Sequence, residues 1–165
     1  MMSLSLESAL AIGLGANLSS CHGPPESTLR LIASRLTALL LEWGDADAQD
    51  VRCSSFMKTQ PVGGPPGQDE YCNAVLLISR VQRPPSEVAA LELLNEMQCL
   101  EQSCGRDRAR EQRWGPRTLD LDLLFWGELR LEHPELVLPH PRLHLRSFVL
   151  EPLLQAIQGV HPPCW

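Results

Sequence analysis

Proline- and glycine-rich breaks divide this chain into two successive strand–helix–strand runs, and this order strongly limits the folds available to it. A proline pair precedes each helical segment, where helices commonly begin. The predicted elements are a strand at 9–17, a helix opened by Pro24–Pro25, strands at 51–58 and 71–79, a helix from Ser86 that Gly105 can end, and a strand at 118–126. Residues 126–132 suggest a hairpin continuation, and 138–157 a loop that leads into a short helix.

Two strand–helix–strand runs in tandem form the split βαβ order of ferredoxin-like folds. At 165 residues the chain is long enough to build one domain around its own core. We therefore predict an α+β fold, a ferredoxin-like α/β/α sandwich with a mostly antiparallel central sheet. We expect a single domain over residues 1–165, in which the proline- and glycine-rich segment 59–70 is an irregular loop.

Two acids lie one residue apart in the leucine-rich run Leu119–Leu123. The run alternates strictly between leucine and aspartate, which is the period of a half-buried strand. Because residues i and i+2 of a strand share a face, Asp120 and Asp122 point the same way while the leucines point oppositely. On a helix the two acids would sit about 200° apart and could not converge. An edge strand whose acids merely face water is an alternative that this run alone leaves open.

Arginines crowd the segment that precedes this strand. Five of the chain's 13 arginines fall within residues 105–117, against two acids, Asp107 and Glu111, in a chain of net charge −6. The five are Arg106, Arg108, Arg110, Arg113 and Arg117. Guanidinium groups bind phosphate oxygens through paired hydrogen bonds, so the segment suits a polyanion. The alternative is a solvated loop whose arginines pair with acids elsewhere.

Together, the acids and the arginine loop predict a magnesium–nucleotide site. Magnesium is typically held by one or two carboxylates together with substrate phosphates. Phosphoryl transfer requires mainly positioning and charge neutralisation from the protein, and these residues suit both tasks. The usual nucleotide signatures are missing, since GLGANLSS at 13–20 fits neither the P-loop nor G-x-G-x-x-G. We interpret that segment as a turn after a core strand, and a role near a ligand stays open for it.

A second binding site is suggested by Thr59, Pro61, Tyr71 and Asn73. Tyr71 and Asn73 share a strand face, which sets an aromatic plane beside an amide that can donate and accept hydrogen bonds. This combination suits a flat heterocycle with polar edges. A purely structural asparagine is the alternative. His140 in LPHPR could contact a phosphate, although a lone loop histidine is more often incidental.

Composition argues against several classes of function. The net charge of −6 disfavours a general nucleic-acid or membrane binder, and the presence of a single lysine, Lys58, disfavours lysine chemistry. The six cysteines are scattered without a C-x-x-C pair, and we expect no signal peptide before them. We therefore expect reduced thiols in a cytoplasmic protein. We also expect a monomer whose partners are small molecules, with no nucleic acid and no membrane.

The run RWGPRTLDLDLLFWG, residues 113–127, resembles the signature of the 6-hydroxymethyl-7,8-dihydropterin pyrophosphokinases of folate biosynthesis. The similarity extends over nearly the whole chain, through AIGLGANL, TQPVGGPPGQDEYCNAV and LPHPRLHLRSFVLEPL. The resemblance implies the ferredoxin-like fold reached above. It also implies transfer of a diphosphoryl group from ATP to the pterin hydroxymethyl oxygen, with release of AMP. ATP would be the co-substrate, and two Mg²⁺ ions would be the cofactors.

The resemblance also implies roles for individual residues. Asp120 and Asp122 would bind both magnesium ions and, with Arg108 and Arg113, would support catalysis. The positions on the nucleotide side are Gln98, Glu101, Arg108, Arg113, Arg117, His140 and Arg146. The positions around the pterin are Thr59, Pro61, Val62, Tyr71, Asn73, Trp114 and Phe148. Trp114 and Phe148 would stack on the two faces of the pterin, and Asn73 would bind its polar edge.

Two other classes of function remain open from the residues. A non-catalytic nucleotide- or RNA-binding module of this shape needs exposed aromatic residues on its central strands, and aromatics make up only 5% of this chain. A kinase-like enzyme that transfers the γ-phosphoryl group and releases ADP would also be compatible with the acids and the arginine loop. Only the resemblance argues against that alternative.

Overall fold

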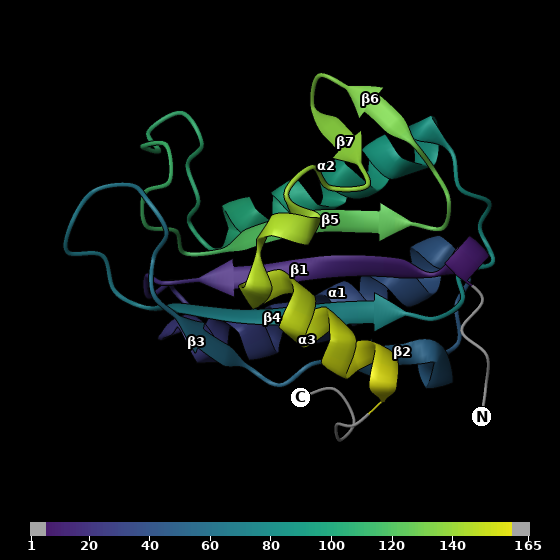
Figure 1. The fold of residues 1–165 in the computed structure, drawn as a ribbon, viewed down its shortest axis with the longest axis horizontal. Helices are drawn as coiled ribbons and strands as arrows, with labels where there is room; N and C mark the ends of the chain where they lie inside the picture. Colours follow the sequence, from purple (N-terminus) through teal and green to yellow (C-terminus); the bar gives the residue numbers. More distant parts are fainter. Residues whose placement is uncertain (1–5, 160–165) are drawn as a thin grey trace.

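The computed structural model describes residues 6–159, which build one antiparallel sheet with helices against both faces (Figure 1). Hydrogen bonds join the strands in the order β2–β4–β1–β5, and β3 also pairs with β4. The strands of this sheet are β1 (Leu10–Ala16), β2 (Val51–Cys53), β3 (Met57–Thr59), β4 (Tyr71–Ile78) and β5 (Asp120–Trp126). The α-helices are α1 (Pro25–Gly44), α2 (Glu87–Ser103) and α3 (Ser147–Gln158), and the short 3-10 helices are η1 (Leu6–Ser8), η2 (Ala48–Asp50) and η3 (Leu143–Leu145).

The two strand–helix–strand runs interleave within the sheet. β5, from the second run, lies beside β1, from the first, and β4 lies between β1 and β2. Every pair in the sheet is antiparallel. This is the arrangement of a ferredoxin-like fold, so the predicted α+β class and its antiparallel sheet are confirmed.

Two apolar layers lie on opposite faces of the sheet because side chains alternate along each strand. On β1, Leu10, Ile12 and Leu14 pack into the layer that contains the buried faces of α1 and α2. The opposite layer lies under α3 and contains Ala9, Ala11, Val75, Leu77, Leu124, Val149, Leu153 and Ala156. On this second face β1 carries only alanine and glycine, which leaves space above the sheet where α3 does not cover it.

The two long helices begin where the sequence indicates, and α2 ends just before the predicted Gly105. α1 starts at Pro25 and buries Leu29, Ile32, Leu36 and Leu40, spaced three or four residues apart. Ser86 caps α2, because its hydroxyl accepts a hydrogen bond of 3.2 Å from the Ala89 N–H. After α2 the chain turns at Gly105, whose φ of +84° favours glycine.

The single strand predicted at 51–58 is wrong, because that segment forms two short strands on the same edge of β4. Residues 54–56 separate them and face only two residues of β4, so the register shifts by one. The Ser54 N–H donates to the Val75 carbonyl at 2.9 Å, and the Val75 N–H donates to the Ser54 hydroxyl at 2.9 Å. The Ser54 hydroxyl therefore replaces a backbone carbonyl as the hydrogen-bond acceptor between the strands. The hydrophobic periodicity of the sequence does not reveal such a replacement.

The hairpin expected at 126–132 has a different partner from the one expected. β6 (Leu131–His133) pairs with β7 (Leu136–Leu138) in a separate two-stranded ribbon, and not with β5. Gly127, with a φ of +52°, turns the chain away directly after β5. The sequence marks this reversal, but it does not identify which strands pair.

The expectation that all six cysteines are reduced is wrong for Cys53, which is disulfide-bonded. Cys21, Cys72, Cys99 and Cys104 have free thiols. Cys164, which the expectation also covered, lies outside the described residues. None of the helices described between residues 6 and 159 is long and apolar enough to cross a membrane.

Candidate active site

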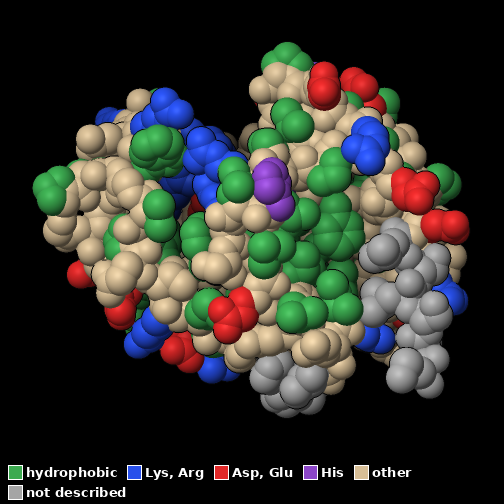
Figure 2. Space-filling view, in the orientation of Figure 1, with side chains coloured by type: hydrophobic (Ala, Val, Ile, Leu, Met, Phe, Trp, Pro, Cys, Tyr) green, Lys and Arg blue, Asp and Glu red, His purple; other side chains and the backbone are tan. Residues whose placement is uncertain are grey.

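A cavity of about 660 Å³ opens on the sheet face beside α3. In Figure 2 it corresponds to a hollow around which arginine side chains gather. Strands β1, β4 and β5 form its floor. Its walls come from three segments far apart in the sequence, and their lining residues fall within 59–63, 114–117 and 140–149.

No side chain of β1 rises into the middle of the cavity, because β1 places two glycines between the polar residues of β4 and β5. Gly13 pairs with Asp122, and Gly15 lies between Asp120 and Asn73. A Cβ at position 15 would come within 3.1 Å of the Asn73 side-chain oxygen. The glycines of GLGANLSS therefore lie within a strand, and the interpretation of 13–20 as a turn is wrong for them. They leave room for a ligand directly above the sheet.

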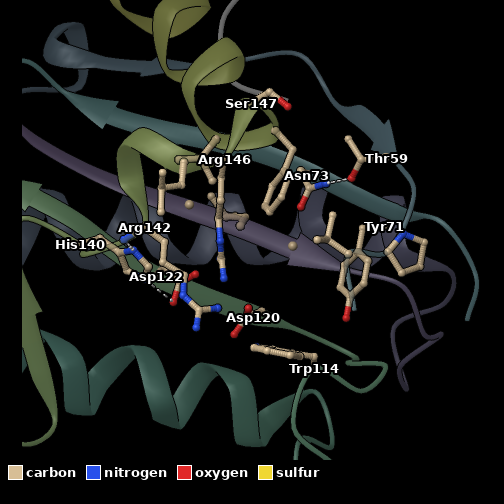
Figure 3. Close-up of a pocket in the computed structure, with 18 of the residues that line it drawn as sticks. Thr59, Tyr71, Asn73, Trp114, Asp120, Asp122, His140, Arg142, Arg146 and Ser147 are labelled. Atoms are coloured by element: carbon tan, nitrogen blue, oxygen red, sulfur yellow. Dashed lines mark hydrogen bonds and ion pairs between the residues drawn. The ribbon is translucent and has the colours of Figure 1, made fainter. Parts of the chain in front are cut away.

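Asp120 and Asp122 point into the cavity from the same face of β5, as the alternation predicts (Figure 3). Leu121 and Leu123 belong to the apolar layer on the opposite face. β5 is an edge strand, as the alternative supposed, but its acids line the cavity and do not simply face water. Both carboxylates face a concave surface that is lined with arginine side chains.

Asp120 is held by two arginines. Arg106 Nη1 donates to Asp120 Oδ1 at 2.7 Å, and Arg117 Nη1 donates to Asp120 Oδ2 at 2.8 Å. Burial acts to raise the pKa of Asp120, but the charges of Arg117 and Arg106 outweigh it and hold that pKa below its usual value. Asp120 is therefore a fixed anion in the floor.

Asp122 has a different environment. Within residues 6–159 it forms no ion pair with an arginine, and its Oδ1 lies 3.8 Å from His140 Nε2. Burial, followed by the charge of Asp120, raises the pKa of Asp122 to about 7. Burial lowers the pKa of His140, so the imidazole offers Asp122 little compensating charge near neutral pH. Asp122 is the acid that gains most from an added cation.

Arg106 is the centre of a buried ion-pair network. Its side chain is only 2% exposed and bonds Glu101 at 2.6 Å, Glu111 at 2.6 Å and Asp120 at 2.7 Å. Glu101, on α2, is 1% exposed and also accepts from Arg108 at 2.6 Å and from the Leu121 N–H at 2.9 Å. The alternative in which the loop arginines pair with acids is therefore correct for Arg106, Arg108 and Arg117, although Arg106 is buried and not solvated. Arg106 ties the start of the loop to β5 and α2.

The aromatic part of the cavity lies at the end away from His140 and Asp122 (Figure 3). Trp114 faces it with a positive φ of +57°, and Phe148 lines it from the start of α3. Asn73 donates to the Thr59 hydroxyl at 2.7 Å, and the Tyr71 hydroxyl donates to the Gly115 carbonyl at 2.9 Å. The cavity therefore combines a fixed amide with aromatic side chains, which suits a flat, hydrogen-bonding ring.

Side-chain hydrogen bonds join three segments at this end of the cavity, namely the turn directly after β1, loop 60–70 and the arginine loop. Gln68 Nε2 donates to the Trp114 carbonyl at 3.1 Å and to the Pro65 carbonyl at 3.2 Å. Asn17 accepts from the Arg117 N–H at 2.7 Å and donates to the Asp69 carbonyl at 3.1 Å. Loop 60–70 and the arginine loop therefore meet through two amide side chains.

Most of the predicted site residues converge on this one cavity. Those that line it are Thr59, Pro61, Val62, Tyr71, Asn73, Trp114, Arg117, Asp120, Asp122, His140, Arg146 and Phe148. Four lie outside the lining. Gln98 is half-buried on α2, Glu101 is fully buried, Arg108 pairs with Glu101, and Arg113 is exposed with its Cζ 4.6 Å from the centre of the Trp114 ring. The chemical role of every one of these residues stays a prediction.

Sequence reasoning missed several lining residues. Gly13 and Gly15 have a usable signal, because two glycines at i and i+2 inside an apolar strand leave one face without side chains. Arg142, two residues after His140, also lines the cavity. A lone arginine in a loop carries no comparable signal.

A sequence model of the 7,8-dihydro-6-hydroxymethylpterin-pyrophosphokinase family matches residues 11–158. The 2-amino-4-hydroxy-6-hydroxymethyldihydropteridine pyrophosphokinase of Synechocystis sp. is 36% identical over 144 residues, which are 87% of this chain and 64% of that relative. The proteins of the same name from Haemophilus influenzae and Pseudomonas aeruginosa are 37% identical over 144 residues and 42% identical over 156 residues. Those alignments cover 87% and 92% of this chain, and 78% and 82% of the two relatives.

The family match therefore runs from the second residue of β1 to the last residue of α3. More than a third of the aligned residues are identical in each of these relatives. The chain accordingly belongs to the 7,8-dihydro-6-hydroxymethylpterin-pyrophosphokinase family, the ATP-dependent diphosphotransferases of folate biosynthesis.

Proposed function

We propose that this cavity transfers the terminal diphosphate of ATP to the hydroxymethyl oxygen of 6-hydroxymethyl-7,8-dihydropterin. In this reaction the pterin oxygen bonds to the β-phosphorus. The bond from the β-phosphorus to the α,β-bridging oxygen breaks, and AMP leaves with that oxygen. The observation that best supports this function is that one cavity holds both a carboxylate pair and an aromatic, amide-bearing recess. The family of the chain gives the reaction its direction.

The arginine-lined end of the cavity suits the nucleotide. Arg117, His140 and Arg146 line it, and Arg113, outside the lining, lies over the Trp114 ring. One guanidinium group can form two parallel hydrogen bonds to phosphate oxygens. The phosphate chain of ATP is the most highly charged part of either substrate. We therefore assign these residues, with Gln98, Glu101 and Arg108, to the nucleotide side. Glu101 would act there through Arg106 and Arg108, since its side chain is buried.

The aromatic end suits the pterin. Trp114 and Phe148 would stack on the ring, and Asn73 would hydrogen-bond its polar edge. Asn73 already donates to Thr59, so one amide hydrogen and the carbonyl oxygen are left for a ligand. Pro61, Val62 and Tyr71 would enclose the remaining edge, because all three line the same recess.

The donor chemistry of the floor fits magnesium. Asp120 and Asp122 provide hard oxygen ligands on one face, and no group of three or more His, Cys, Asp or Glu residues within 6–159 could hold a metal without the substrate. Magnesium is commonly bound in this way, by two carboxylates plus substrate phosphates. We propose that Asp120 and Asp122 hold two Mg²⁺ ions with ATP. The metal would supply charge neutralisation for the diphosphate.

The protein's own groups would orient the reactants and exclude water. The loops joined by Gln68 and Asn17 stand over the aromatic end, where they can shield the attacking oxygen from solvent. We further propose that residues 1–165 act as a single pyrophosphokinase domain, as a cytoplasmic monomer that does not bind nucleic acid.

The test is to incubate the protein with Mg-ATP, with and without the hydroxymethyl-dihydropterin, and to identify the nucleotide product by chromatography. Pterin-dependent AMP, in equal amount to the pterin diphosphate, is the expected result. Pterin-dependent ADP would establish γ-phosphoryl transfer and refute the proposal. A folded protein that forms neither nucleotide in response to pterin would refute it as well.

A further inference from the structure

Arg142 occupies a position in the cavity that neither the motif nor the family resemblance assigns. It lies in the loop between β7 and η3, where its backbone N–H donates to His140 Nδ1 at 3.2 Å. Its side chain reaches into the cavity toward Trp114 (Figure 3), and Arg142 Cζ lies 5.5 Å from the centre of the Trp114 ring. A guanidinium group therefore stands against the aromatic side chain that the pterin needs.

The charge of Arg142 is not balanced by a carboxylate. Arg106 and Arg117, by contrast, both bond to Asp120. Arg142 forms no ion pair within the described part of the chain, and its guanidinium lies over the Trp114 ring. Trp114 is 43% exposed, and a cation–π contact at such a site is weak. A nearby phosphate chain would be a stronger partner for this guanidinium.

Two groups thus compete for one aromatic face. A pterin ring stacked on Trp114 from within the cavity would displace the Arg142 guanidinium. The phosphate chain of ATP would lie close by, because Asp120, Asp122, His140 and Arg146 line the same cavity as Arg142. Arginine has a long side chain, so it can exchange one partner for the other without movement of its backbone.

We propose that Arg142 is a phosphate-binding residue that covers Trp114 in the ligand-free molecule and moves onto the phosphate chain when the nucleotide binds, which leaves Trp114 free for the pterin. This inference rests on the function proposed above. It assigns Arg142 to the nucleotide and not to the pterin, although its contact in the ligand-free molecule is with a pterin-side residue.

The experiment compares the wild-type protein with Arg142→Ala and Arg142→Lys. Calorimetry would measure the affinity for a magnesium complex of a non-hydrolysable ATP analogue, and then for the pterin at saturating analogue. Arg142→Ala should bind the analogue about tenfold more weakly, which is the effect of about 1.4 kcal/mol. It should bind the pterin within twofold of wild type. Arg142→Lys keeps the positive charge but loses the planar guanidinium that forms two hydrogen bonds. Its affinity for the analogue should lie between those of wild type and Arg142→Ala.

Arg83 provides a matched control. It too lies over a tryptophan, with Arg83 Cζ 4.9 Å from the Trp43 ring, but it is not part of the cavity lining. Arg83→Ala should therefore leave both affinities unchanged. Thermal melts of all three variants would show whether each is folded. If Arg142→Ala melts much lower than wild type, the affinity of Arg142→Lys is compared with that of wild type instead.

Two results would overturn the inference. One is unchanged affinity for the analogue in Arg142→Ala. The other is a loss of pterin affinity at least as large as the loss of analogue affinity, which would place Arg142 on the pterin. Failure of the wild-type protein to bind the pterin at all would instead count against the proposed function. The wild-type titration thus separates the two failures.

Discussion

The buried position of Arg106 allows a strong prediction about stability. In Arg106→Met the side chain keeps most of its volume and loses its charge, so Glu101, only 1% exposed, loses the partner at 2.6 Å. Glu101 retains Arg108 and the Leu121 N–H, and Asp120 retains Arg117. Breaking a buried pair by removal of one partner typically costs about 3–5 kcal/mol, and the retained contacts favour the lower end of that range. For a chain of this size, about 3 kcal/mol lowers the Tm by roughly 6–12 °C.

The same substitution should make stability depend on pH. Burial raises the pKa of Glu101, and the charge of Arg106 is the largest influence that lowers it. Without Arg106 the folded-state pKa rises further above its unfolded value, so the folded state binds the proton more tightly. Stability then falls as the pH rises through that window, and the loss should be smaller at pH 5 than at pH 8.

Calorimetric melts of wild type, Arg106→Met, Glu101→Gln and the double variant would measure these effects. The double variant should recover part of the loss, because it removes the unpaired buried charge. Arg113→Met is the matched control, since that arginine is exposed on the same loop. A Tm for Arg106→Met within 2 °C of wild type at pH 8 would refute the reasoning, and so would a larger loss at pH 5.

Three shorter predictions follow from other parts of the molecule. Arg113→Ala should leave the Tm nearly unchanged, since exposed substitutions change stability by less than about 0.5 kcal/mol, but should strongly reduce AMP formation; normal activity with a lowered Tm would contradict this. Ser86→Ala should cost about 1 kcal/mol in urea unfolding through loss of the α2 cap, and an unchanged midpoint would contradict it. A thiol reagent at pH 8 should label the exposed Cys21 and Cys99, whereas Cys72, buried with a pKa raised to about 11, should react only after unfolding; site-resolved mass spectrometry would detect labelling of Cys72 in the folded protein, which would refute this.

Sequence patterns predicted well the elements whose side chains follow one simple period. Strict alternation at Leu119–Leu123 placed both acids on one face of a strand, and this proved correct. The proline pairs and Ser86 located both long helices, because these residues act on the backbone next to them. Such signals are local, so a single sequence reveals them directly.

Features that depend on contacts between distant segments were not predicted. The sequence left open whether the loop arginines bind a polyanion or pair with acids, and the structure buries Arg106 against Glu101 while Arg113 is exposed. Charge patterning cannot show which arginine meets a carboxylate on another element. The break at Ser54 depends on a hydrogen bond to β4, and the place of Arg142 depends on the path of a loop. Both require the folded chain.

The central claim is that Asp120 and Asp122 jointly support the diphosphate transfer. Changing either acid to asparagine removes a charge with little change in volume. Asp122→Asn relieves the repulsion between the two acids. Asp120→Asn loses ion pairs to Arg106 and Arg117 and should melt lower, but it should stay folded because Arg106 keeps its bonds to Glu101 and Glu111. The decisive measurement is pterin-dependent AMP formation by Asp120→Asn and Asp122→Asn at saturating magnesium, with thermal melts as the check on folding. Each folded variant should be about a thousandfold slower than wild type, the effect of about 4 kcal/mol on the barrier. Near-normal turnover in either variant would show that its carboxylate is not part of the catalytic site.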